Sequence, residues 1–205
     1  MQIVKRIRGA GNMGHSQAQK EANHDRILSA AMALLRDKGL DHMGVAQVMR
    51  AAGLTHGGFY SHFPNREAMV AEALRAAFAR DERRLEKAAA RHGRSERVGM
   101  IEAYLSPAHR DNPTEGCTAA ALAGDATRAD PAIRHLFTEQ LTHYRDRIAA
   151  LIPAEREAAE SHALFGIAAM IGALLVARAV DDEKLSDDIL EAARHHLTKG
   201  METER

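Results

Sequence analysis

Residues 42–67 constrain the fold of this chain more than any other stretch, because their pattern is typical of two short helices joined by a glycine turn. Apolar residues recur at helical spacing over residues 45–52. Gly53 follows, where a helix end often needs a left-handed residue. A second short helix over residues 55–63 is stopped by Pro64. The pattern predicts a helix-turn-helix, a unit that places its second helix in the major groove of DNA.

These residues also resemble a known family. Residues 54–63 (LTHGGFYSHF), followed by Asn65-Arg66-Glu67, are similar to the recognition region of TetR/AcrR-type transcriptional regulators. The similarity extends back through residues 27–31 and Gly39 with the spacing between blocks intact, and covers about residues 20–75. The resemblance implies a DNA-binding head joined to a helical body that binds a ligand and forms a dimer.

The resemblance and the docking mode of this motif together indicate which head residues contact DNA. The N-terminal end of the reading helix approaches base edges, so His56, the one long polar side chain on its first turn, is expected to read bases. By resemblance, Tyr60, His62 and Arg66 contact phosphates. Gly44 stands where the family has a Ser or Thr cap, which leaves only a backbone contact. The predicted DNA-binding residues are Gly44, Thr55, His56, Gly57, Gly58, Tyr60, Ser61, His62 and Arg66.

The charge distribution supports a DNA-binding head. The chain has a net charge of zero, which by itself argues against a nucleic-acid partner. However, residues 1–66 contain nine Lys and Arg against four Asp and Glu, so the remaining residues are acidic as a group. Residues 1–22 show little periodicity and are expected to form a flexible basic arm. That arm either reaches DNA phosphates or is simply a loose terminus.

The composition predicts an all-α fold of about nine helices. Hydrophobic residues make up 45% of the chain and aromatic residues only 4%, and long β-branched runs are missing. We expect the flexible arm over 1–22, the helix-turn-helix domain over 23–66, a connecting helix over 67–92, and a ligand-binding and dimerisation domain over 93–205. The charged run at 80–87 is expected to be a solvated, salt-bridged face. Residues 106–116 are expected to form a loop.

Several classes of protein and of site are not supported by the sequence. A single cysteine cannot form an internal disulfide, and neither a signal peptide nor an uninterrupted apolar run of membrane-spanning length is present, so a cytoplasmic location without a membrane partner is expected. We find no phosphate loop, nucleophile elbow or suitable carboxylate pair, so we expect no enzyme activity. The histidines are scattered, so we expect no metal site and no cofactor.

The second domain contains a candidate dimer interface. Residues 163–180 are apolar on nearly every face, and a helix of this kind must be covered on both sides. One side can pack on its own core, while the other needs a partner helix, which fits the four-helix interface that the resemblance also implies. The predicted interface residues are Gly166, Met170, Gly172, Ala173, Ala177, Ile189 and Leu190.

The second domain also contains a candidate effector pocket, in the region where the resemblance places a cavity. A pocket needs apolar walls with a few polar groups, and we expect no inward-facing cluster of charges. The predicted ligand is therefore small, mostly uncharged, and apolar or aromatic. The predicted wall residues are Tyr104, Cys117, Phe137, Leu141, Tyr144 and Phe165. Each of them, taken singly, could equally fill the core.

The favoured function is a dimeric, ligand-responsive regulator that binds a pseudo-palindromic operator, and repression is implied by the resemblance alone. Two alternatives remain. Cys117 stands at an expected helix start, where a thiol pKa can be lowered, so it could sense oxidants or electrophiles with His109, Arg110 or His135 as helpers. It could also be a small buried side chain. The other alternative is a structural or recruitment protein that binds DNA without an effector.

Overall fold

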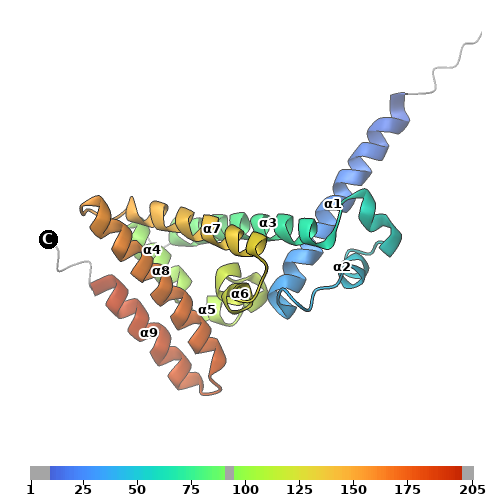
Figure 1. Ribbon diagram of the computed structural model, residues 1–205. Helices are drawn as coiled ribbons and strands as arrows, with labels where there is room; N and C mark the ends of the chain where they lie inside the picture. The colour runs from blue at the N-terminus through green and yellow to red at the C-terminus, as the bar shows by residue number, and fades with distance from the viewer. Residues whose placement is uncertain (1–9, 91–94, 200–205) are drawn as a thin grey trace, which may run out of the picture.

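The computed structural model describes residues 10–90 and 95–199, and no β-strand occurs within these ranges (Figure 1). The predicted all-α fold is confirmed. The elements, in order, are α1 Ala10–Lys38, α2 Val45–Ala51, η1 His56–Ser61, α3 Arg66–Ala89, α4 Glu96–Tyr104, α5 Pro107–Arg110, η3 Pro113–Glu115, α6 Thr118–Ala126, α7 Pro131–Ala149, α8 Arg156–Ala179 and α9 Glu183–Lys199, where η marks a 3₁₀ helix.

The described chain has a small head at one end and a larger helical body at the other (Figure 1). The head consists of the C-terminal half of α1, together with α2, η1 and the first turns of α3. Helix α3 then runs from the head into the body, where it packs against α4, α6 and α7. Helices α8 and α9 pack against each other at the end of the body away from the head (Figure 1). Helix α3 therefore connects the two parts directly.

The head has the predicted helix-turn-helix core. Gly53 follows α2 with a φ of 67°, and the amide of Leu54 donates to the carbonyl of Met49 across the turn (2.9 Å). Phe59 and Phe63 are 0% and 2% exposed, so both point inward as expected from their spacing of four residues. This packing fixes the angle between α2 and η1.

One expectation about the head is wrong. Residues 10–22 belong to α1 and do not form a flexible arm, and residues 1–9 lie outside the described part of the chain. Good helix formers over residues 17–22 favour this extension, as do two pairs of side chains at i, i+4 spacing that hydrogen-bond at 3.0 and 3.1 Å. The predicted second short helix is present as a 3₁₀ helix, η1, and the hydroxyl of Thr55 accepts no capping bond. Gly57 and Gly58 lower the α-helical propensity there.

The body differs from expectation at one smaller point. Residues 106–116 do not form a plain loop, because α5 and η3 lie within them, and Ser106 Oγ caps α5 by accepting from the amide of His109 (3.2 Å). Helix α9 begins at Glu183, where Asp182 Oδ1 accepts from the amide of Leu185 (2.9 Å).

Helix α8 is the one helix in the described ranges that is long and apolar enough to cross a membrane by length and composition. A single helix of this kind is weak evidence for a membrane span, because core helices of soluble proteins meet the same criterion. Only 28% of its apolar window is buried in the described chain. The exposed remainder therefore needs another explanation, which its packing against α7 and α9 does not supply.

The glycine turn of the head yields a stability prediction. Gly53→Ala should lower the free energy of unfolding by about 1–2 kcal/mol, because a Cβ is strained at a φ of 67°. The matched control is Gly57→Ala, where a Cβ would meet nothing within 4 Å and φ is not positive. Denaturant unfolding of both variants tests this prediction, and equal stabilities would contradict it.

Candidate nucleic-acid interface and ligand cavity

The predicted DNA-binding residues lie together around the turn and η1, and most are exposed. Tyr60 is 69% exposed although Phe59 beside it is fully buried, so the two rings separate the outer face of η1 from the core. Gly44 is the N-cap of α2, as predicted, and its amide donates to Gln47 Oε1 (3.1 Å). The exposed members of the predicted set are Gly44, Thr55, His56, Gly57, Tyr60 and Ser61. The head thus presents a polar surface suited to docking on DNA.

His62 and Arg66 are more enclosed than a simple phosphate contact requires. Burial lowers the pKa of His62, and the nearby His24 and Lys20 lower it further. These surroundings disfavour the charged form of the ring. The Arg66 guanidinium donates to the carbonyls of Met43 (2.9 Å) and Leu40 (2.5 Å). Arg66 consequently braces the segment between α1 and α2, a structural role that the sequence did not indicate.

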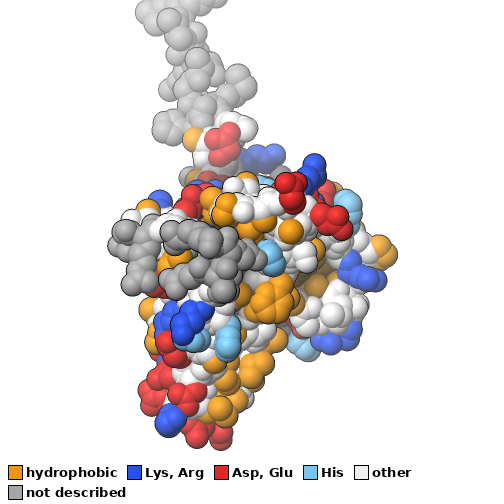
Figure 2. Space-filling model, turned by 90° about the vertical axis from the view of Figure 1, so that its left-hand side faces the viewer, with side chains coloured by type: hydrophobic (Ala, Val, Ile, Leu, Met, Phe, Trp, Pro, Cys, Tyr) orange, Lys and Arg blue, Asp and Glu red, His pale blue; other side chains and the backbone are white. Residues whose placement is uncertain are grey.

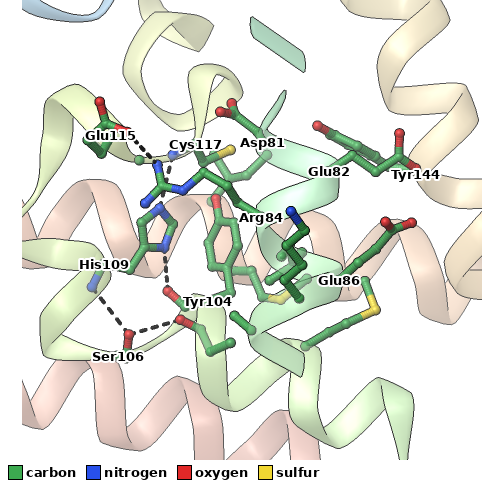
Figure 3. A pocket seen from close by; sticks show the side chains of 18 of the residues that line it. Asp81, Glu82, Arg84, Glu86, Tyr104, Ser106, His109, Glu115, Cys117 and Tyr144 are labelled. Carbon is green, nitrogen blue, oxygen red and sulfur yellow. Dashed lines mark hydrogen bonds and ion pairs between the residues drawn. The ribbon is translucent and has the colours of Figure 1, made fainter. Parts of the chain in front are cut away.

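The body contains a cavity of about 470 Å³. Its walls come from α3, α4, α7 and α8, with the segment from α5 to Cys117 closing one side. Three of the predicted pocket residues, Tyr104, Cys117 and Tyr144, lie in this wall (Figure 3). The Tyr104 hydroxyl points toward the Cys117 sulfur (Figure 3) and has no hydrogen-bond partner among the described residues. A buried hydroxyl in this state can donate to a ligand.

The other three predicted pocket residues lie elsewhere. Phe137 is 7% exposed and meets Phe78 edge-on, with ring centroids 5.3 Å apart, so it belongs to the core. Leu141 lines neither described cavity. Phe165 lines a second cavity of about 220 Å³, and its side chain is 68% exposed. Helical spacing indicated that these residues share a face, but it could not show how far that face extends beyond the cavity.

The charged run of α3 faces the cavity as well as solvent, so the prediction that no charges point inward is wrong. Arg147 Nη1 on α7 pairs with Glu82 (2.6 Å) and Glu86 (2.5 Å) on α3. Arg84 Nη1 pairs with Glu115 at 3.3 Å. These pairs form because α3 is covered by α7 and by the segment around η3, which supply opposite charges. Most charged side chains of the cavity wall are therefore paired with a side chain of opposite charge at the rim of the cavity.

Three buried polar groups of the cavity wall are neutral. Burial raises the pKa of the Cys117 thiol and raises that of the Tyr104 phenol well above its usual value. Burial raises the pKa of Tyr144 in the same way. A thiol with a raised pKa is a poor nucleophile, since the thiolate is the reactive form. The cavity can therefore offer neutral donors to a ligand, and it does not favour thiol chemistry.

His109 joins three segments of the cavity wall. Its Nε2 accepts from the amide of Cys117 (2.9 Å), which requires the proton to be on Nδ1, and Nδ1 donates to the carbonyl of Tyr104 (2.6 Å). Burial lowers the pKa of His109, although its bond to Tyr104 opposes this effect. The other proposed helpers of Cys117 are not suitably placed: Arg110 pairs with Asp111 and Asp187, and His135 with Glu139. No cluster of three metal-binding side chains occurs in the described ranges.

A buried ion pair connects the cavity wall to the head. Arg36, in the last turn of α1, bonds Asp81 Oδ1 at 2.8 Å, and the two side chains are 1% and 8% exposed. The Thr118 amide, at the start of α6, donates to Asp81 Oδ2 (2.6 Å), and Arg36 Nε donates to Thr118 Oγ1 (3.2 Å). Asp81 also lines the cavity. We call Arg36, Asp81 and Thr118 the junction.

Sequence reasoning missed the junction entirely. Arg36 and Asp81 lie 45 residues apart, and Arg36 and Thr118 lie 82 apart, so no local pattern links them. A second bond supports the same connection, since Asp125 Oδ2 near the end of α6 accepts from the amide of Leu40 (2.9 Å). Helix α6 thus touches the head at both of its ends.

The outer face of α8 and α9 is apolar and exposed. Figure 2 shows hydrophobic side chains gathered in a strip down this end of the body. The prediction of a two-sided helix is correct, but part of the residue assignment is wrong: Met170, Ala177 and Leu190 are at most 7% exposed and pack within their own subunit. Helical phase decides this, since residues 164, 168, 172, 175 and 176 share the opposite face. The exposed large side chains are Leu164, Phe165, Leu175, Val176 and Leu185.

The head, the connecting helix and the body together form a helical protein with a helix-turn-helix domain. Residues 27–73 match the family described as bacterial regulatory proteins, tetR family. The head therefore has a DNA-binding domain of the TetR family type.

Two curated relatives each match about a quarter of the chain. One is the uncharacterized HTH-type transcriptional regulator YvdT of Bacillus subtilis, 31% identical over 52 residues, which are 25% of this chain and 27% of the relative. The other is the HTH-type transcriptional repressor KstR2 of Mycolicibacterium smegmatis, 34% identical over 58 residues, which are 28% of each chain. The chain therefore matches little more than a quarter of the length of these relatives.

Solved structures extend the similarity of fold to nearly the whole chain. A TetR family regulator from Cytophaga hutchinsonii superposes with a TM-score of 0.76 at 21% identity, covering 91% of this chain and 98% of that one. A TetR regulator from Chloroflexus aurantiacus gives 0.75 at 20% identity, covering 88% and 96%. The reduced form of E. coli NemR gives 0.71 at 18% identity, covering 86% and 95%. At these identities the comparison shows a common fold.

Proposed function

We propose that this protein is a dimeric transcriptional repressor that binds a pseudo-palindromic DNA operator and releases it when a small, mostly apolar effector enters the cavity of the body. The junction is the observation that carries this proposal, because it bonds the cavity wall to the last turn of α1 in the head. A DNA target and a single cysteine fit a cytoplasmic location. The name of the repressor KstR2, which matches over 58 residues, supports repression.

The proposed dimer forms through the apolar face of α8 and α9. Five of the six exposed large hydrophobic side chains of the described residues lie on these two helices. A subunit pair joined there would bury them and would present two heads to successive major grooves, about 34–36 Å apart. An interface of this kind also accounts for the low burial of α8 within one chain.

The proposed release mechanism uses the junction. Buried ion pairs tolerate little displacement, because a separated charge in a dry site costs several kcal/mol. A ligand beside Asp81 and Cys117 would shift the start of α6, and the junction would then move with it and displace the end of α1. The spacing of the two heads would change, and the operator would be released.

Of the alternatives, a thiol sensor is disfavoured by the raised pKa of Cys117 and because both ring nitrogens of its neighbour His109 are already bonded to backbone groups. A DNA-binding protein without an effector remains the competing class. An operator selection with the purified protein, followed by a release screen against small molecules, separates the two. Saturable release supports the proposal, whereas a screen without any releasing compound supports a protein with no effector.

The proposed DNA contacts can be separated by substitution. His56→Ala should change base preference, with about 1–3 kcal/mol lost at the base pair that it reads. Tyr60→Phe should instead weaken binding to all sequences alike, because phosphate contacts carry little base information. Operator selection with each variant measures both effects. A uniform loss of affinity for His56→Ala would contradict the assignment.

The proposed interface can be tested at Gly172, in the middle of the exposed stripe of α8. Gly172→Arg should dissociate the dimer, because an unpaired buried charge costs several kcal/mol, more than about a hundredfold in Kd. The control is Gly124→Arg on α6, an exposed glycine where added atoms also meet open space. Light scattering at micromolar concentration measures the outcome. A monomeric wild-type protein would exclude the proposed assembly.

The proposed coupling can be tested by replacing the ion pair. Arg36→Met combined with Asp81→Leu should fold, since apolar residues of similar volume often replace buried pairs without loss of stability. Because Asp81 lines the cavity, the Kd of the double variant for a compound from the release screen is measured first, and the coupling is compared at saturating concentrations of that compound. The double variant should lose most of the factor, on the order of 5–150-fold, by which that compound weakens operator binding.

The control for this experiment replaces the exposed pair Lys184 and Asp188 on α9 by the same residue types. Ligand binding by calorimetry and operator binding in the presence and absence of ligand give the coupling directly. A double variant of Arg36 and Asp81 that still releases the operator at the wild-type ligand concentration would show that coupling runs by another route.

A further inference from the structure

The two cavities follow one another along the same three helices. Both are lined by Met100 of α4, Ile148 of α7 and Met170 of α8. On α4 the larger cavity continues toward the C-terminal end of the helix, to Tyr104, and the smaller one toward the N-terminal end, to Arg97. On α7 and α8 as well, the larger cavity extends mainly to one side of the shared residue and the smaller cavity mainly to the other. The cavities are therefore two chambers on one axis, separated by three shared side chains.

The partition between the chambers is built from adaptable side chains. Met100 and Met170 are each 7% exposed and supply two of its three members. Methionine is unbranched, with several rotatable bonds, and fills irregular gaps without a fixed shape. A change of rotamer can therefore join the chambers while the helix backbones stay in place. A partition of β-branched residues alone would be far stiffer.

The smaller chamber is mainly apolar. Its polar lining residues are Arg97, His162 and His196, and the remaining walls are aliphatic, aromatic or glycine. The lining residues outside the shared partition that carry no polar side-chain group are Ile101, Leu151, Ile152, Phe165, Gly166 and Leu197. This chamber is suited to a hydrocarbon chain or ring, which gains by leaving water.

The larger chamber supplies the polar end. Tyr104 lies one helical turn after Met100 on α4, so its hydroxyl is beyond the partition when viewed from the smaller chamber. The phenol is buried and neutral, its hydroxyl faces the Cys117 thiol, and no other group of the described residues bonds it. The wall arginines Arg84 and Arg147 are already paired with carboxylates. The chamber thus presents a hydrogen-bond donor to a neutral acceptor and little net charge to an ion.

We infer that the effector site is a two-chamber site for an elongated, uncharged molecule with an apolar chain and a carbonyl or hydroxyl oxygen at one end. The oxygen accepts from Tyr104, and the chain passes Met100 and Met170 into the smaller chamber. This inference rests on the proposed function, because it identifies the chemical class of the proposed effector. It adds a second chamber and a defined direction to the site.

A homologous series of 2-alkanones, from 2-heptanone to 2-tridecanone, tests this inference. Binding to the full chain is measured by isothermal titration calorimetry in the absence of DNA. We expect the Kd to fall about fourfold for each added methylene throughout the series, as burial of a chain requires. Tyr104→Phe should weaken binding of every member by the same factor, about 2–10-fold, because only the hydrogen bond to the oxygen is lost.

Gly166→Leu should shorten the site. Gly166 lines the smaller chamber only, and a Cβ there would meet nothing within 4 Å. The short alkanones should bind as they do to the wild type, while the gain per methylene should stop once the larger chamber is full. Leu197→Trp, on α9, fills the same chamber from the other side and serves as a second variant. The control is Gly124→Leu on α6, because Gly124 lines neither chamber. This variant should bind every alkanone of the series with the Kd of the wild type.

Each outcome separates this inference from the proposed function. The two-chamber site is overturned if no 2-alkanone binds. It is also overturned if Gly166→Leu and Leu197→Trp show the same dependence of Kd on chain length as the wild type. If the alkanones bind with the full series but leave the operator bound, the two-chamber site is supported and the proposed ligand response fails. If other compounds release the operator while no alkanone binds, the ligand response stands and the inferred ligand class is wrong.

Discussion

The arrangement of the head on the body depends on one buried ion pair, between Arg36 of α1 and Asp81 of α3. Two opposite charges removed from water are stable only when their remaining hydrogen-bonding groups are also satisfied. Here the Thr118 amide, the Thr118 hydroxyl and the carbonyl of Thr114 complete the set. Burial raises the pKa of Asp81, while Arg36 beside it acts in the opposite direction. A small shift of α6 would therefore displace α1 as well.

The cavity next to this ion pair combines two kinds of wall. Its rim carries charges that pair with one another, and its interior carries neutral phenols and a thiol whose pKa values are raised by burial. Paired charges at the rim attract an ionic ligand only weakly, whereas neutral donors inside an apolar space suit an uncharged acceptor. The same arrangement explains why Cys117, the one cysteine, is better understood as a wall residue than as a reactive group.

Much of the fold could be predicted from local pattern. The turn at Gly53 and the inward anchors Phe59 and Phe63 depend on residues within about one helical turn of each other, and both are found where expected. The errors occurred where no local rule operates. The extended start of α1 has weak periodicity, and α5 and η3 are short helices held by caps within a stretch rich in loop-forming residues.

The sequence by itself determined the type of DNA-binding domain, the helical fold of the chain and the polar face of its head, because these follow from short-range spacing and from one specific run of residues. Tertiary structure alone decided which helix faces meet. In the tertiary structure Phe137 lies in the core, and Phe165 lines the second chamber. The charged run of α3 faces the cavity, and Arg66 bonds the segment between α1 and α2. Tertiary structure also created the junction, since a buried charge finds its partner through the packing of distant helices, and periodicity within one helix contains no information about that partner.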